Sequence, residues 1–227
     1  NKNIKIRIRG NELDLSFLDI KKTKSQLRNI NIDLDINVEK FYYINNTNFN
    51  KANLIGKFNN VWQSLKFNGI FEEGGELSIN LRPQNNKRHF TIISSNSGKA
   101  LKIKKISKSI IGGDLNFKGE YDSIKDDNNF DANLSIKNFA LKKESKIAKF
   151  VKFIRIFDIK KQLAGDTEDF EYAEMKIQKR DKYYEILNGK AYGGLMALTL
   201  GGHINKKNES VNIEGMVAPT HAIDSWI

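Results

Sequence analysis

The sequence predicts a mostly β protein built from a long antiparallel sheet. The main observation is strict alternation of apolar and polar residues, which is clearest from Ile30 to Val38. A period of two places the apolar side chains on one face of a strand and does not fit a helix. Short turns rich in glycine and asparagine separate such segments. The 39% apolar and 29% charged residues, with only two prolines, are typical of a folded chain.

The predicted strands follow one another closely along the chain. The first two are Ile4 to Ile8 and Leu13 to Phe17. After Ile30 to Val38, the remaining strands are centred on 77–81, 90–92, 115–117, 134–136, 175–177, 184–186, 198–200 and 211–213. We expect turns at Glu73–Gly75, Ile111–Gly113, Asn188–Gly189, Gly193–Gly194 and Gly201–Gly202. Because most strands have no helix between them, the sequence favours an antiparallel meander over βαβ units.

Two segments have the pattern of helices. Residues from Ser97 to about Ile106 predict a short helix with Ser97 as its N-cap. Residues 145–157 predict an amphipathic helix, with apolar side chains at helical spacing and lysine and arginine on its other faces. That helix either covers part of the apolar sheet face or contacts an anionic lipid surface.

Catalytic and metal-binding motifs are missing from the sequence. His89, His203 and His221 are isolated and lack the spacing of metal ligands. There is no GxSxG elbow, P-loop or GxGxxG turn, and the acidic run from Asp166 to Glu174 lacks the spacing of a calcium loop. The chain also has no cysteine. We therefore expect no enzyme activity, no cofactor and no metal.

The net charge of +11 raises the question of a nucleic-acid or membrane partner. The basic residues are spread along the whole chain, and no RNP, helix-turn-helix or zinc pattern is visible, so we expect no nucleic acid. No apolar stretch approaches the roughly 20 residues of a membrane helix, and no signal peptide is visible. The chain begins without Met and stops where a helix is expected to start, which suggests a fragment of a longer protein.

Four stretches of the chain carry a resemblance to a known family. They are Ser94–Leu101 followed by Ile111–Gly119, the predicted helix at 146–157, Ile186–Gly193, and Leu198–Ile204 followed by Val211–Ser225. In this order they resemble the C-terminal region of the AsmA-like superfamily, of the YhdP and TamB type, from about Ile30 onward. The chain departs from the family pattern at Asp224, where Asn is common, and in lacking an N-terminal membrane anchor. We interpret 1–227 as a single continuous unit, with upstream strands in 1–95 and the best-matching module in 96–227.

The resemblance implies a long curved sheet that forms an open apolar groove. It also implies a periplasmic protein, tethered to the inner membrane by a segment outside this chain, that moves phospholipid between the inner and outer membranes. Its partners would be phospholipid, membrane surfaces and other envelope proteins. The groove face would hold acyl chains on Ile32, Leu34, Ile36, Leu77, Ile79, Leu81, Leu115, Phe117, Leu134, Ile136, Leu198, Leu200 and Ile213.

The residues by themselves leave an alternative open. Most alternating strands face an ordinary closed core, so without the resemblance the pattern favours a sandwich or barrel with no room for a ligand. The alternative function is then a closed β-sandwich that binds another envelope protein and carries no lipid.

Overall fold

The prediction of a mostly β fold is confirmed. The computed structural model describes residues 2–16, 30–103, 106–122, 129–142, 167–181, 183–193, 196–205 and 210–220. Strands make up most of this part of the chain, accompanied by one short α-helix and a single 3-10 turn.

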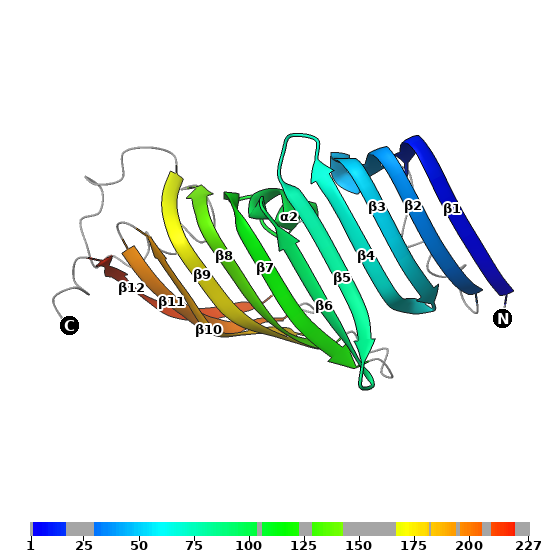
Figure 1. Cartoon of the computed structure of the whole chain (residues 1–227). Helices are drawn as coiled ribbons and strands as arrows, with labels where there is room; N and C mark the ends of the chain where they lie inside the picture. Colours follow the sequence, from blue (N-terminus) through cyan, green and yellow to red (C-terminus); the bar gives the residue numbers. More distant parts are fainter. Residues whose placement is uncertain are drawn as a thin grey trace. The chain divides into compact units, whose positions relative to one another are not determined.

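The described strands form one open sheet, in which every strand lies beside its sequence neighbours (Figure 1). The strands are β1 (Lys2–Asp14), β2 (Ile30–Tyr43), β3 (Thr47–Asn59), β4 (Val61–Phe71), β5 (Glu76–Gln84), β6 (Lys87–Ser94), β7 (Ile110–Asp122), β8 (Phe130–Lys142), β9 (Thr167–Arg180), β10 (Tyr183–Gly193), β11 (Met196–Asn205) and β12 (Val211–Pro219). The helix α2 (Ser97–Ile103) lies between β6 and β7 in the sequence, and the turn η1 (Ile44–Asn46) follows β2. Adjacent strands are antiparallel from β2 to β6 and from β8 to β12.

The first pair of strands departs from the antiparallel expectation, because β1 is parallel to β2. The chain between Asp14 and Ile30 is long enough for the crossover of about a dozen residues that a parallel pair requires. The register also matches unlike charges, with Lys5 opposite Asp33 and Arg7 opposite Asp35. In addition, the expected second strand from Leu13 is wrong, because Leu13 belongs to β1 and Phe17 lies outside the described residues.

Two compact units divide the chain. Unit 1 comprises Asn1–Ser95 with Lys118–Asp126, and unit 2 comprises Asn96–Phe117 with Asp127–Ile227. Unit 1 thus contains β1 to β6 and the end of β7, whereas unit 2 contains α2, the start of β7 and β8 to β12.

Some of the expected turns are instead irregularities inside strands. Gly74 and Gly75 do form a turn, with φ angles of 88° and 95°. By contrast, Gly112–Gly113 lies within β7, Asn188–Gly189 within β10 and Gly201–Gly202 within β11. The β10 pair coincides with a shift in register against β11, so it is a β-bulge and not a hairpin. Gly193 ends β10, and Gly194 lies outside the described residues.

The short helix is confirmed, but its N-cap was assigned to the wrong residue. The side chain of Asn96 accepts a hydrogen bond from the backbone N–H of Lys99 at 3.1 Å, which is the geometry of an N-cap. Ser97 is the first helical residue, is fully buried, and donates its hydroxyl to the carbonyl of Gly112 in β7. Ser97 therefore fixes the helix to the sheet of unit 2. The second predicted helix lies outside the described residues.

Candidate lipid-binding face

Apolar side chains form continuous rows across the strands of unit 1. Because residues paired in neighbouring strands share a face, the pairing register defines each row. The Ile8–Ile92 row crosses β1 to β6 and consists of Ile8, Ile36, Leu54, Phe67, Ile79 and Ile92. The adjacent Ile6–Phe90 row consists of Ile6, Leu34, Gly56, Leu65, Leu81 and Phe90. One face of unit 1 is thus apolar across all six of these strands.

Aromatic residues extend this apolar face toward one end of β2, β3 and β4. The ring of Phe49 lies edge-on to that of Phe67 with centroids 5.0 Å apart, and Phe41 lies 6.2 Å from Phe67. Phe71 is 4.9 Å from Phe49. Gly69 leaves the space for this cluster, since a Cβ there would lie 3.0 Å from the Phe67 ring and 3.1 Å from that of Phe49.

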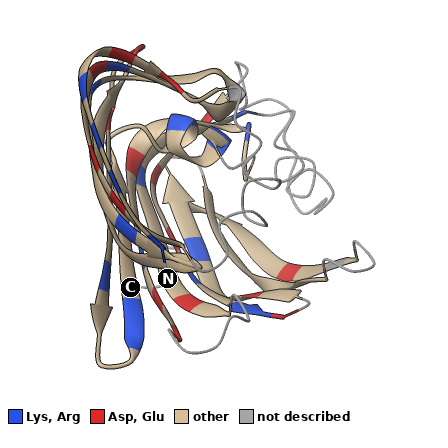
Figure 2. Cartoon of the chain, turned by 90° about the vertical axis from the view of Figure 1, so that its right-hand side faces the viewer, with Lys and Arg blue, Asp and Glu red and all other residues tan. Residues whose placement is uncertain are grey.

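The opposite face of the same strands is polar. The neighbouring cross-strand row consists of Arg7, Asp35, Ile55, Lys66, Asn80 and Thr91. Arg9 donates to the carboxylate of Asp35 at 2.7 Å, and this bond lowers the pKa of Asp35. Figure 2 shows both basic and acidic residues on the described strands. The charged residues of β3, β4 and β6 are all basic.

Unit 2 has a similar apolar row built from smaller side chains. The Ile136–Val217 row crosses β8 to β12 and consists of Ile136, Ala173, Ala191, Leu198 and Val217. Next to it, Leu200 lies opposite Gly189 and Gly215. Phe139 and Phe170 stack at 5.3 Å. Alanine and glycine at the middle of these rows leave more room above the backbone than the phenylalanines of unit 1 do.

The residues predicted to hold acyl chains all lie within strands, and none of them is highly exposed. Six are buried, namely Ile36, Leu77, Leu81, Leu115, Ile136 and Leu198, and seven are partly exposed, namely Ile32, Leu34, Ile79, Phe117, Leu134, Leu200 and Ile213. Ile36 and Ile79 share one row of unit 1, Leu34 and Leu81 share the other, and Leu77 lies opposite Gly69. Ile136 and Leu198 share the row of unit 2.

Sequence reasoning missed the part of this face that β3 and β4 contribute. Leu54, Leu65 and Phe67 are central to the two rows of unit 1, yet their strands do not alternate strictly. In β3, Asn50 and Lys51 separate the buried Phe49 and Ala52, and the register shifts there. A second shift in β4 falls beside Trp62, whose ring lies 5.5 Å from Phe58. The phenylalanines in β3 and β4 were the feature of the sequence that could have indicated these strands.

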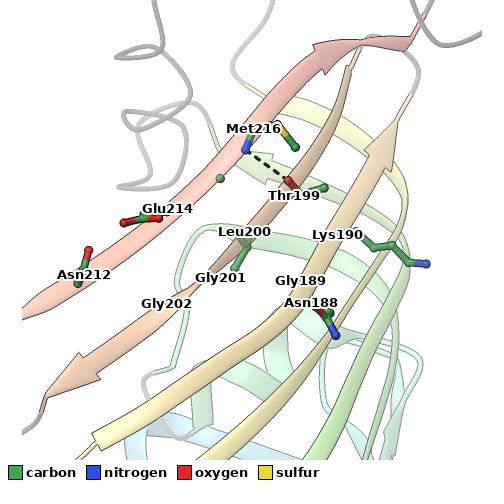
Figure 3. Close-up of a pocket in the computed structure, with 11 residues that line it drawn as sticks. Asn188, Gly189, Lys190, Thr199, Leu200, Gly201, Gly202, Asn212, Glu214 and Met216 are labelled. Carbon is green, nitrogen blue, oxygen red and sulfur yellow. Dashed lines mark hydrogen bonds between the residues drawn. The ribbon is translucent and has the colours of Figure 1, made fainter. Parts of the chain in front are cut away.

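A hollow of about 760 Å³ lies over β10, β11 and β12 in unit 2 (Figure 3). Gly189, Gly201, Gly202 and Gly215 form much of its wall, and Lys190 and Glu214 come from its two outer strands. Lys190 already pairs with Glu174 at 2.8 Å, which lowers the pKa of Glu174 and raises that of Lys190. The wall mixes groups of both charges with neutral ones, so it does not define one ligand chemistry.

The described residues include neither a metal-binding cluster nor a membrane-spanning helix. They contain no group of three or more acidic or histidine side chains arranged to hold a metal ion. In the same part of the chain, no helix has the length and apolar character needed to cross a membrane.

Comparison of the chain with protein-family models, with curated proteins and with solved structures finds no match. The apolar face and its rows therefore carry the functional argument.

Proposed function

We propose that this chain is a segment of a periplasmic lipid-transfer protein of the AsmA-like kind, which holds phospholipid acyl chains on the apolar face of its sheet. The observation that carries the proposal is the run of the Ile8–Ile92 row across six strands. Five steps of about 4.8 Å between strands make such a row about 24 Å long, which is enough to support an extended acyl chain.

The proposal includes a groove formed by bending of the strands toward their apolar face. Register shifts occur beside Lys51 in β3 and beside Asn188 in β10, and both residues have positive φ angles. Bulges of this kind bend the strand that contains them. A bent sheet would surround an acyl chain on more than one side while its end remains open to the next part of the protein.

Apolar contact alone supplies enough affinity for such a role. Each buried methylene contributes about 0.8 kcal/mol, so eight methylenes on a row contribute about 6 kcal/mol before the cost of ordering the lipid. A row of similar side chains also gives similar energies at successive positions. Lipid would then slide along the face without a large barrier.

The remaining parts of the proposal follow from the resemblance. The segment would work in the periplasm, tethered to the inner membrane by a part of the protein outside this chain, and it would exchange lipid with membrane surfaces and support outer-membrane maintenance. We propose no catalytic step, cofactor or nucleic-acid partner for it.

Native mass spectrometry with lipid extraction tests the proposal directly. The chain exported to the periplasm of a Gram-negative host is expected to carry phospholipid. The double variant Leu34→Asn with Ile79→Asn places two amides on the partly exposed apolar rows, and we expect it to lose most of that lipid while remaining folded. A folded parent without lipid would contradict the proposal. It would favour the alternative function, in which the chain binds another envelope protein and carries no lipid.

The matched control carries the same substitutions on the opposite face. Ile55 and Ile93 are 51% and 49% exposed, and their register places them on the polar side of β3 and β6. The variant Ile55→Asn with Ile93→Asn should retain lipid at the level of the parent. Equal loss from both variants would show that the lipid does not depend on the apolar rows.

A further inference from the structure

The polar face of unit 1 carries three basic side chains that form no ion pair within the described part of the chain. They are Lys57 in β3, Lys66 in β4 and Arg82 in β5, and all three are exposed. The carboxylates of Asp35 and Glu120 are paired with other basic residues. The three cations are therefore available to a partner outside the chain.

The pairing register places these cations close together. Lys57 is opposite Ser64, which lies two residues before Lys66. Lys66 is opposite Asn80, which lies two residues before Arg82. With about 4.8 Å between strands and about 3.4 Å per residue, the Cα atom of Lys66 lies about 8 Å from those of the other two, which are about 10 Å apart. We call these three residues the Lys57–Arg82 patch.

Carboxylates in the neighbouring strands do not neutralise the patch. The charged residues of β3 and β4 are all basic, and the one carboxylate of β5 is Glu76, six residues before Arg82. Asp33 in β2 lies opposite Lys57, but it lies opposite Lys5 on its other side as well. The patch thus keeps a positive charge.

An exposed isoleucine adjoins the patch. Ile55 is opposite Lys66, lies two residues before Lys57, and is 51% exposed. On its other side it is opposite Asp35, whose carboxylate is held by Arg9. An apolar side chain beside clustered cations suits the surface of an anionic bilayer, because the apolar group enters the acyl boundary while the cations stay near the phosphates. Protein interfaces instead have an apolar core that is depleted of lysine.

We propose that the Lys57–Arg82 patch, together with Ile55, is the surface by which unit 1 docks on an anionic lipid bilayer. The proposal rests on the proposed function for its membrane partner and adds the place of contact. The patch and the apolar rows lie on opposite faces of the same strands. Docking through the patch therefore leaves the lipid-binding face uncovered.

Vesicle flotation at about 0.15 M salt tests the docking surface. We expect the parent to bind vesicles of equal parts phosphatidylglycerol and phosphatidylcholine about tenfold or more tightly than vesicles of phosphatidylcholine alone. The triple variant Lys57→Gln, Lys66→Gln, Arg82→Gln should lose about tenfold or more in affinity for the anionic vesicles, since each basic residue near an anionic surface contributes about fivefold. A parent that binds both kinds of vesicle equally, or neither kind, would overturn the proposal.

The matched control removes the same charge from exposed positions of unit 2. It is the triple variant Lys137→Gln, Lys142→Gln, Lys176→Gln. Because salt screens charges that are distant from the bilayer, this variant should bind the anionic vesicles within about threefold of the parent. Equal weakening by the two triple variants would show that net charge alone governs binding, and would overturn the assignment to the patch.

A label at Ile55 reports contact with the bilayer directly, because the chain has no cysteine. Ile55→Cys carrying an environment-sensitive fluorophore should shift its emission to the blue when anionic vesicles are added. The same label on Met216→Cys, at a side chain that is 73% exposed in β12 of unit 2, should not shift. Equal shifts at the two positions would contradict the proposal.

Native mass spectrometry of the Lys57, Lys66 and Arg82 triple variant separates docking from the proposed function. We expect the variant to retain as much lipid as the parent, because the substituted side chains face away from the apolar rows. A folded parent without lipid would contradict the proposed function. Unchanged vesicle binding by a triple variant that retains its lipid would contradict the docking surface alone.

Discussion

Three non-glycine residues inside the described strands have backbone conformations that strand residues rarely adopt. Lys51 in β3, Asn138 in β8 and Asn188 in β10 have φ angles of 51°, 51° and 49°. Asn138, like Lys51, is exposed. Each of the two forms, with a polar neighbour, a pair that separates two buried apolar residues of its strand. At such points two successive side chains face the polar side, and the apolar side chains stay on one face although the alternation is interrupted.

Glycine at position 202 is required by both its backbone angle and its surroundings. Its φ is 138°, and a Cβ added there would lie 2.1 Å from the carbonyl oxygen of Asn212 in β12. We expect Gly202→Ala to lower the free energy of unfolding by about 2 kcal/mol or more, because the strand pair would have to separate. Urea unfolding followed by circular dichroism measures this change.

Gly10 supplies the control for that substitution. Nothing lies within 4 Å of a Cβ added at Gly10, and its backbone needs no positive φ. Gly10→Ala should therefore stay within about 0.5 kcal/mol of the parent. If Gly202→Ala proved as stable as Gly10→Ala, the close approach of β11 to β12 would be wrong.

At the scale of the elements, the parallel pairing of β1 and β2 follows from residues on both faces. The isoleucines of β1 lie opposite Ile32, Leu34 and Ile36. On the other face, Lys5 lies opposite Asp33 and Arg7 opposite Asp35. The chain has no cysteine, so an introduced pair reports on the register without interference. We expect Lys5→Cys with Asp33→Cys to form a disulfide under mild oxidation, since opposite residues fall within the Cα separation that a disulfide requires. Mass spectrometry of the unreduced protein detects the link.

A second cysteine pair distinguishes the two directions of pairing. An antiparallel arrangement centred on Arg7 and Asp35 would bring Lys5 opposite Asn37, whereas the parallel register separates them by four residues, about 13 Å along the strand. Lys5→Cys with Asn37→Cys should therefore not cross-link within one molecule. Efficient cross-linking of that pair, with none at Lys5 and Asp33, would contradict the parallel assignment.

The sequence predicts those elements whose pattern is local and regular. Strands such as Ile30 to Val38 alternate strictly, and the structure places them as expected. β3 and β4 were missed because bulges interrupt their alternation, and the direction of β1 depends on a pairing partner that β1 alone does not reveal. The sequence predicts the N-cap at Ser97 because both Asn96 and Ser97 have side chains that can cap a helix. In the structure the Ser97 hydroxyl donates to the carbonyl of Gly112, and Asn96 is the N-cap.

At the scale of the whole molecule, alternation predicts which residues share a face but not which face a ligand uses. The apolar rows follow from alternation together with the register, and the register depends on the positions of the bulges. Arg88 shows the same limit, because a basic residue in a Lys-Arg-His run looks like part of a solvated strand. Its burial became visible only when the pairing of Pro83 with Arg88 was known.

The net charge of the chain predicts that salt affects the encounter of the chain with a membrane but not its retention of bound lipid. A charge of +11 attracts anionic bilayers, and this attraction weakens as the screening length falls from about 30 Å at 0.01 M salt to about 8 Å at 0.15 M. If the proposed function holds, lipid transfer from phosphatidylglycerol vesicles should slow several-fold over this range, whereas transfer from phosphatidylcholine vesicles should change little. Fluorescent-lipid transfer rates measure both. The amount of lipid already bound should stay constant, because apolar contacts are not screened by salt.

Two outcomes would contradict this prediction. An equal salt dependence for the two kinds of vesicle would show that the positive charge plays no part in the encounter. Loss of bound lipid at higher salt would show that charge, and not the apolar rows, retains the lipid.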